Sequence, residues 1–320
     1  MFKIKRKVLF LLTAITIVLP LCFTSVTANA FSIRGLRIVN YAKKFLGVPY
    51  VYGATGPNAF DCSGLTSYTY RNALNINIGR TTDTQITKGT PVSKNELEPG
   101  DLVFPHTGHV GIYVGNNQFI NAPQTGDVVK ISSITKFYTG RRIIKANSSI
   151  EDLTFNSTFY TSHYSDLNRI FGNNEISLGN HFLNSGIGEG RAASQIFDVK
   201  YYLNNNADLK AAFGTNYTTA YNHFLTNGYK ENRKISPIFD VNYYLNNNPD
   251  VRAQLGTDHF AVINHFLVNG MKEGRQGNSA FNLSTYKNNS PDLVQAFRTN
   301  NIAYYNHYLN CGINEGRKAN

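Results

Sequence analysis

Cys62 is the residue with the most distinctive chemistry in this 320-residue chain. It stands in Phe60-Asp61-Cys62-Ser63-Gly64, after a Gly- and Pro-rich stretch and before residues 65–74, whose apolar side chains favour a helix. The pattern predicts the thiol at a helix N-terminus, where unpaired N–H groups and a partial positive charge favour the thiolate. A single cysteine is more often a buried structural side chain, so the interpretation depends on its partners.

A thiolate nucleophile needs a nearby base, and that base needs a third group to fix its tautomer. His109 opens one predicted strand, Asn121 lies near the end of the next, and Asn116-Asn117 between them is a hairpin signal. Antiparallel pairing would bring the two side chains onto neighbouring strands. Two alternatives remain, namely His106 as the base and Asn121 as a solvated amide beside the turn.

Helix signals precede strand signals in residues 31–146. A helix is predicted over 36–47 and another after Cys62, followed by strands over 102–104, 109–114, 118–122, 127–131 and 141–144. Helices followed by an antiparallel meander indicate an α+β domain.

Five motifs in this region resemble the NlpC/P60 family of cell-wall cysteine peptidases, whose core is papain-like. They are Pro49-Tyr50-Val51-Tyr52-Gly53, Phe60-Asp61-Cys62-Ser63-Gly64, Arg80-Thr81, Pro99-Gly100-Asp101-Leu102-Val103-Phe104 and His109-Val110-Gly111-Ile112-Tyr113-Val114-Gly115. They occur in the order of the family and cover about residues 33–146.

The resemblance implies a role for seven residues. It makes Cys62 the nucleophile, His109 the base and Asn121 the orienting residue, where relatives have His, Asn or Gln. It also implies that Tyr50 lines the site and helps hold the oxyanion, and that Asp61 and Ser63 recognise the amino end of a stem peptide, with Arg80 among the substrate-binding residues. The chain departs from the common pattern at Ala54, where relatives often have Gly, and at Ile120-Asn121.

The resemblance further implies peptidoglycan as the substrate and stem-peptide amide hydrolysis as the reaction. The expected bond joins D-γ-glutamate to a diamino acid, and the alternatives are an N-acetylmuramoyl-L-alanine amidase or a crossbridge peptidase. A non-catalytic wall-binding or adhesive protein is the alternative of another class. No cofactor, no metal ion and no nucleic acid partner are expected.

Residues 1–30 have the pattern of a signal peptide, with a basic start, an apolar core over 8–18 and Ala28-Asn29-Ala30 as a cleavage site. No other segment is predicted to span a membrane, so the protein is expected to be secreted and associated with the cell wall. Cys62 and Cys311 then remain. We expect no disulfide between them, because positions equivalent to Cys311 are occupied by Ser and Asn.

The positive charge is concentrated in one region. Residues 31–146 contain 13 Lys and Arg against 6 Asp and Glu, a net charge of +7, whereas residues 147–320 contain 14 of each. A basic surface suits anionic wall polymers, and the alternative is ordinary solubilising charge.

Residues 155–320 are predicted to be four 42-residue helical repeats after a linker at 147–154. Equivalent positions are Phe155, Phe197, Phe239 and Phe281, and His181, His223, His265 and His307. Each unit contains a glycine expected at a helix C-terminus and ends in Glu and Arg, expected to pair between units. The histidines are interpreted as structural, with no Cys or carboxylate at ligand spacing. The repeats are expected to tether the protein to anionic wall polymers or a surface polysaccharide.

Overall fold

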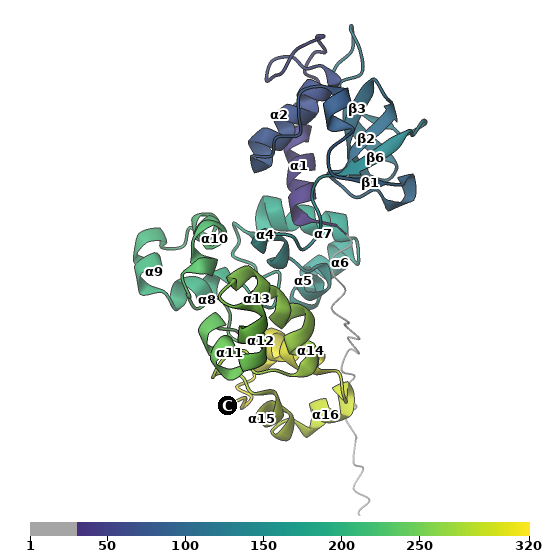
Figure 1. Cartoon of the computed structure of the whole chain (residues 1–320). Helices are drawn as coiled ribbons and strands as arrows, with labels where there is room; N and C mark the ends of the chain where they lie inside the picture. Colours follow the sequence, from purple (N-terminus) through teal and green to yellow (C-terminus); the bar gives the residue numbers. More distant parts are fainter. Residues whose placement is uncertain (1–30) are drawn as a thin grey trace, which may run out of the picture.

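The computed structural model describes residues 31–320, so the predicted signal peptide lies outside the described residues. A region with a β-sheet, residues 31–146, lies at the top of Figure 1, and a wholly helical region lies below it. No helix within residues 31–320 is both long enough and apolar enough to cross a membrane.

One antiparallel sheet forms the centre of the upper region. Its strand order is β1-β6-β2-β3-β4-β5. The strands are β1 (Thr90–Val92), β2 (Leu102–His106), β3 (His109–Gly115), β4 (Gln118–Asn121), β5 (Lys130–Ser133) and β6 (Thr139–Arg142). Asn116 and Asn117 both have positive φ between β3 and β4, as a tight hairpin turn of this kind requires. β1 was not predicted, and β5 and β6 are displaced by two to three residues from the predicted strands.

Two helices, α1 (Ile33–Lys43) and α2 (Cys62–Leu74), pack together and against β3. Their buried residues, such as Ile38 and Leu65, form one core with Leu102, Val110 and Ile112 of the sheet. Two short helices, α3 (Thr82–Gln85) and η1 (Lys94–Glu96), lie in the connection to β2. The result is a helix-on-sheet α+β domain in which α2 and β3 are neighbours.

The predicted linker at 147–154 is packed rather than extended. Ile150–Leu153 forms the short helix α4, and Asp152 accepts a hydrogen bond from Ser32 at the start of α1. Apolar side chains beside this hydrogen bond join the two regions as well, because Phe31, Ile33 and Leu36 belong to the core of the lower region. Residues 31–36 and 150–153 therefore form a packed interface between the upper and lower regions, on either side of residue 146.

The lower region contains short helices and single helical turns. They are α5 (Ser157–His163), α6 (Ser165–Phe171), α7 (Glu175–His181), η2 (Phe182–Gly186), α8 (Val199–Asn204), α9 (Ala207–Phe213), α10 (Tyr217–Thr226), η3 (Gly228–Lys230), α11 (Val241–Asn247), α12 (Pro249–Leu255), α13 (His259–His265), η4 (Phe266–Gly270), α14 (Met271–Glu273), α15 (Leu283–Asn288), α16 (Pro291–Phe297), α17 (Asn301–His307) and η5 (Tyr308–Gly312). Their apolar residues form one continuous core from Leu153 to Ala319.

A buried tyrosine contacts a histidine at four places spaced 42 residues apart. The hydroxyl-to-Nδ1 distances are 3.0, 2.9, 3.0 and 2.8 Å for Tyr160–His181, Tyr202–His223, Tyr244–His265 and Tyr286–His307. Gly312 is the last residue of η5, as predicted, and a Cβ there would lie 2.2 Å from the hydroxyl of Tyr286. Glycine is required there so that the backbone can approach the tyrosine.

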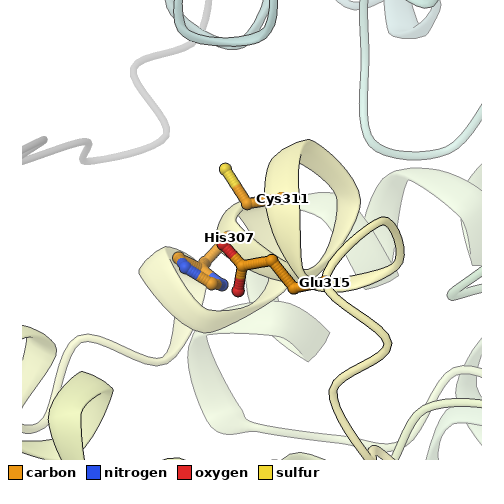
Figure 2. Close-up of side chains that lie close together, drawn as sticks. All are labelled: His307, Cys311 and Glu315. Atoms are coloured by element: carbon orange, nitrogen blue, oxygen red, sulfur yellow. The ribbon is translucent and has the colours of Figure 1, made fainter.

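The recurring Arg pairs within its own unit, not between units as predicted. Arg191 contacts Asp166 and Glu189, and Arg317 contacts Asp292 and Glu315. The first and last units also touch each other, since Asn310 is hydrogen bonded to His163 and Ser162. His307, Cys311 and Glu315 lie near that contact, on the last helical turns (Figure 2).

Candidate active site

Cys62 is the first residue of α2, as the sequence predicts. The carboxylate of Asp61 caps the helix by accepting a hydrogen bond from the N–H of Gly64 at 2.6 Å. Gly64 must lack a side chain, because a Cβ there would lie 2.1 Å from the carbonyl oxygen of Ala54. The thiol is thereby fixed at the first turn of α2, which packs closely against the backbone at Ala54.

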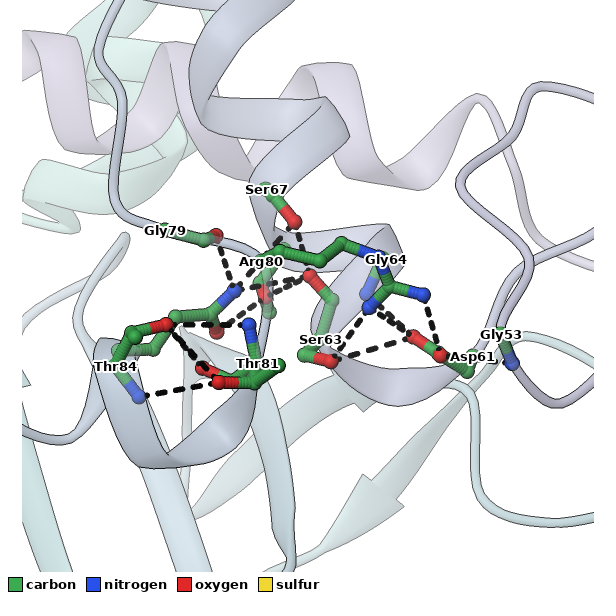
Figure 3. Close-up of polar contacts among 11 residues, drawn as sticks. Gly53, Asp61, Ser63, Gly64, Ser67, Gly79, Arg80, Thr81 and Thr84 are labelled. Carbon is green, nitrogen blue, oxygen red and sulfur yellow. Dashed lines mark hydrogen bonds and ion pairs between the residues drawn. The ribbon is translucent and has the colours of Figure 1, made fainter.

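The Asp61 carboxylate also binds Arg80 (Figure 3). The guanidinium donates at 3.0 and 2.7 Å to the two carboxylate oxygens, and at 2.9 Å to the hydroxyl of Ser63. A further donor is the N–H of Gly53 at 3.0 Å. The structure thus brings together Asp61, Ser63 and Arg80, three residues that the sequence assigned to substrate binding.

His109 and Asn121 meet across β3 and β4. His109 Nε2 lies 3.0 Å from Asn121 Oδ1. The amide is oriented by its other end, since Asn121 Nδ2 donates to the hydroxyl of Ser132 at 2.9 Å and to the carbonyl of Lys130 at 3.3 Å. An oriented amide oxygen can only accept, so the proton of a neutral His109 lies on Nε2 and Nδ1 is left as the proton acceptor.

The Cys62 sulfur lies beside the start of β3, where the backbone N–H of Val110, the residue after His109, lowers the pKa of the thiol. Burial nevertheless raises the pKa of the Cys62 thiol and outweighs the lowering by this N–H and by those of Cys62 and Ser63. The N–H groups at the helix N-terminus thus favour the thiolate, as predicted, but burial has the larger effect and favours the thiol.

Burial also lowers the pKa of His109, the positive charge of a protonated His106 lowers it further, and the hydrogen bond to Asn121 opposes both. His106 itself is exposed, and its ring is stacked 5.8 Å from that of His109. His109 is the better placed base, because His106 is exposed at the surface whereas the ring of His109 is held by Asn121. Burial of the two groups thus favours a thiol and a neutral imidazole over the charged forms.

Comparison with known proteins gives the region a family. Residues 47–148 match the model of the NlpC/P60 family. These residues form an NlpC/P60 domain. The chain is 46% identical over 89 residues to the probable endopeptidase p60 of Listeria grayi, covering 27% of this chain and 17% of the relative. It is 38% identical over 117 residues to the murein DD-endopeptidase MepH of Escherichia coli, covering 34% of this chain and 43% of the relative.

Among solved structures, the NlpC/p60 domain of the peptidoglycan hydrolase SagA is 38% identical, with a TM-score of 0.33, and the match covers 34% of this chain and 97% of that one. The chain spans less than half of the length of both curated relatives. The family match at residues 47–148 excludes residues 155–320.

Tyr50 of the NlpC/P60 domain lies near the thiol. It is half-buried in the same apolar cluster as Cys62, and its pKa is raised by burial and by the neighbouring Cys62 and Asp61. Its backbone N–H is bonded to the carbonyl of Asp127, which fixes the segment in extended form beside β5. Tyr50 thus lies in the neighbourhood of Cys62 and Asp61.

Two supporting residues were missed. Gln85, fully buried on α3, donates to the carbonyl of Ser63 and accepts from the hydroxyl of Thr66, so it ties α3 to the first turn of α2. Gly111 on β3 leaves room for Asn121, because a Cβ there would lie 3.0 Å from the Cβ of Asn121. Gly111 was visible in the sequence within a family motif, whereas no pattern marked Gln85 as buried.

Proposed function

We propose that this protein is an exported peptidoglycan hydrolase whose NlpC/P60 domain cleaves an amide bond of the stem peptide, through Cys62, His109 and Asn121. The observation that carries the proposal is the hydrogen bond between His109 Nε2 and the oriented amide of Asn121, beside the Cys62 thiol. Relatives named as endopeptidases support the same class of reaction.

In the proposed mechanism, His109 Nδ1 takes the thiol proton as the Cys62 sulfur attacks the carbonyl carbon of the amide. In the imidazolium that forms, the Nε2–H still donates its hydrogen bond to Asn121 Oδ1, so the ring does not rotate. The tetrahedral intermediate then expels the amine, which receives the proton from Nδ1, and an acyl-enzyme remains on the sulfur. Water, deprotonated by the same nitrogen, releases the acid and restores the thiol.

The oxyanion needs donors next to the sulfur. Cys62 is the first residue of α2, so its N–H is among the helix's N-terminal donors without an intrahelical acceptor. The hydroxyl of Tyr50 is the second donor that we propose, because Tyr50 lies near Cys62. Both groups stabilise charge that exists only during the reaction.

We propose that Asp61 and Ser63 recognise the amino end of the stem peptide only after part of their contact with Arg80 is broken. The Asp61 carboxylate already accepts from Arg80, Gly53 and Gly64. A substrate ammonium would therefore have to replace one of the Arg80 contacts. Arg80 has 39% of its side-chain surface exposed, so it has room to move.

Digestion of purified sacculi, followed by mass spectrometry of the released muropeptides, tests the proposal. New ends at D-γ-glutamate and the diamino acid are expected, with none from the Cys62→Ala protein. New ends at muramic acid or in a crossbridge would transfer the assignment to an amidase or a crossbridge peptidase. A Cys62→Ala protein that digests sacculi as fast as the wild type would exclude a cysteine mechanism.

We also propose that residues 155–320 tether the domain to the wall, through an anionic polymer or a surface polysaccharide. Tethering raises the local enzyme concentration without changing the chemistry. A chain ending at residue 148 is expected to cleave soluble muropeptides and to be much slower on sacculi. Loss of both activities would instead reflect the exposure of Phe31, Ile33 and Leu36, which would appear as a lower melting temperature.

A further inference from the structure

A second cluster of reactive side chains lies far along the chain from Cys62, on the last helical turns. One ring nitrogen of His307, the sulfur of Cys311 and one carboxylate oxygen of Glu315 all lie within 4.8 Å of one another (Figure 2). Cys311 and Glu315 are exposed and His307 is half-buried. The interpretation that no Cys or carboxylate lies at ligand spacing is therefore wrong for His307.

We propose that these three residues bind a divalent transition-metal ion of the zinc class. Thiolate, imidazole and carboxylate are all ligands of zinc, and zinc accepts three protein ligands with water in the fourth position. Tetrahedral bonding at ordinary zinc distances puts ligand atoms roughly 3.5 Å apart. The atoms lie within 4.8 Å of one another, and Cys311 and Glu315 are exposed, so we propose that their side chains rotate to close the remaining difference.

The imidazole is already oriented for this role. His307 Nδ1 lies 2.8 Å from the hydroxyl of the buried Tyr286, which leaves Nε2 as the nitrogen that binds the metal. Metal-binding histidines commonly have the other ring nitrogen held in this way by a neighbouring oxygen. Glu315 also accepts from Arg317 at 2.5 Å, but each carboxylate oxygen has more than one acceptor site.

Comparison with the other units isolates the thiol as the decisive feature. The second unit has the same histidine and glutamate, with His223 Nε2 4.0 Å from a carboxylate oxygen of Glu231. The position of Cys311 is occupied there by Asn227, and in the third unit by Asn269. Only the fourth unit thus combines all three ligand types among the described residues.

Metal binding would require Cys311 to lose its thiol proton. The sulfur gives its proton to the solvent and donates an electron pair to the metal, so that no oxidant or reductant is involved. Asn310, next to Cys311, is the residue that bonds to His163 of the first unit. A bound ion would therefore stabilise the turn that connects the two ends of the helical region, by ordinary ligand linkage.

The test uses the full chain with Cys22→Ser and Cys62→Ala, so that Cys311 is the only thiol. Titration with Co²⁺ is expected to produce a near-ultraviolet thiolate-to-cobalt charge-transfer band that saturates at one equivalent and is removed by Zn²⁺. Cys311→Asn should abolish the band. The fold should persist by circular dichroism, because asparagine occupies this position in two other units.

Glu315→Gln measures the contribution of the carboxylate, and Glu273→Gln, at the equivalent position of the third unit, is the matched control. We expect Glu315→Gln to weaken Co²⁺ binding more than about tenfold, since even indirect partners of a metal ligand contribute that much. Glu273→Gln should change nothing. Absence of the band, or equal affinity with and without Glu315, would overturn the proposal.

Discussion

Histidine is used in two different ways in the two regions of this molecule. In the NlpC/P60 domain, Nε2 of His109 is held by the amide of Asn121, and the backbone of the next residue, Val110, lies close to the Cys62 thiol. In the helical region, four histidines are held at Nδ1 by buried tyrosines. Orientation of the ring by a neighbouring oxygen is common to both.

The difference lies at the second ring nitrogen. Nδ1 of His109 is left as the acceptor that we propose takes the Cys62 proton, whereas the second nitrogen of His223 faces a surface carboxylate, Glu231. A hydrogen-bonded histidine is therefore not in itself a sign of catalysis. What its other nitrogen faces decides whether it supports a fold, a reaction or, at His307, a metal ion.

The difference between the two kinds of histidine can be tested by mutation, and the largest effect on activity is expected at His109. His109→Ala should lower kcat for muropeptide hydrolysis by several orders of magnitude, as loss of the base does in related mechanisms. His223→Ala, a histidine of the helical region, is the matched control and should leave kcat nearly unchanged. Comparable losses in the two variants would show that both act through folding, and far-ultraviolet circular dichroism would reveal it.

Asn121→Ala is expected to lower kcat by roughly two orders of magnitude, because the ring loses its fixed tautomer. The pH profile separates this role from a structural one. The hydrogen bond to Asn121 raises the pKa of His109, so its loss should move the acid limb of kcat/KM to lower pH. An unchanged acid limb, or a limb displaced to higher pH, would contradict the assignment.

In the helical region, stability should change and chemistry should not. Tyr244→Phe removes the hydroxyl 3.0 Å from His265 Nδ1 and leaves a partly buried nitrogen without its partner. A loss of about 1–3 kcal/mol in the free energy of unfolding is expected, seen as a lower melting temperature. Tyr138→Phe, at an exposed tyrosine, is the control and should have almost no effect.

The smallest predicted effect is at His106. Its positive charge lowers the pKa of His109, so His106→Ala should raise that pKa slightly. His109 must be neutral to act as the base. Activity should therefore be lost at a slightly higher pH on acidification and stay unchanged at pH 8. A large loss at pH 8 would make His106 the base instead.

Much of the domain could be predicted because its signals are local. The Asp61 cap, the α2 start at Cys62 and the Asn116-Asn117 turn each follow from a few adjacent residues. The thiol form of Cys62 could not be predicted, because burial depends on how α2 packs against β3. The buried Gln85 was missed for the same reason.

In the helical region, the period indicated which residues recur but not where their partners lie. Arg191 could have paired within its unit or with a neighbour, since the same acidic residues recur in every unit. The structure selects Asp166 of the same unit. The packing of α4 against α1 was equally hidden, because Asp152 and Ser32 are 120 residues apart.

The contact between Asn310 and His163 limits how this array can vary in length. Gln195 of the first unit also bonds to Asn306 of the fourth, so both ends of the array are already occupied by each other. An open stack of repeats can gain or lose a copy at its end, because each copy contacts only its neighbours. Here a fifth copy would have to displace the first, which makes the array a closed module of fixed size.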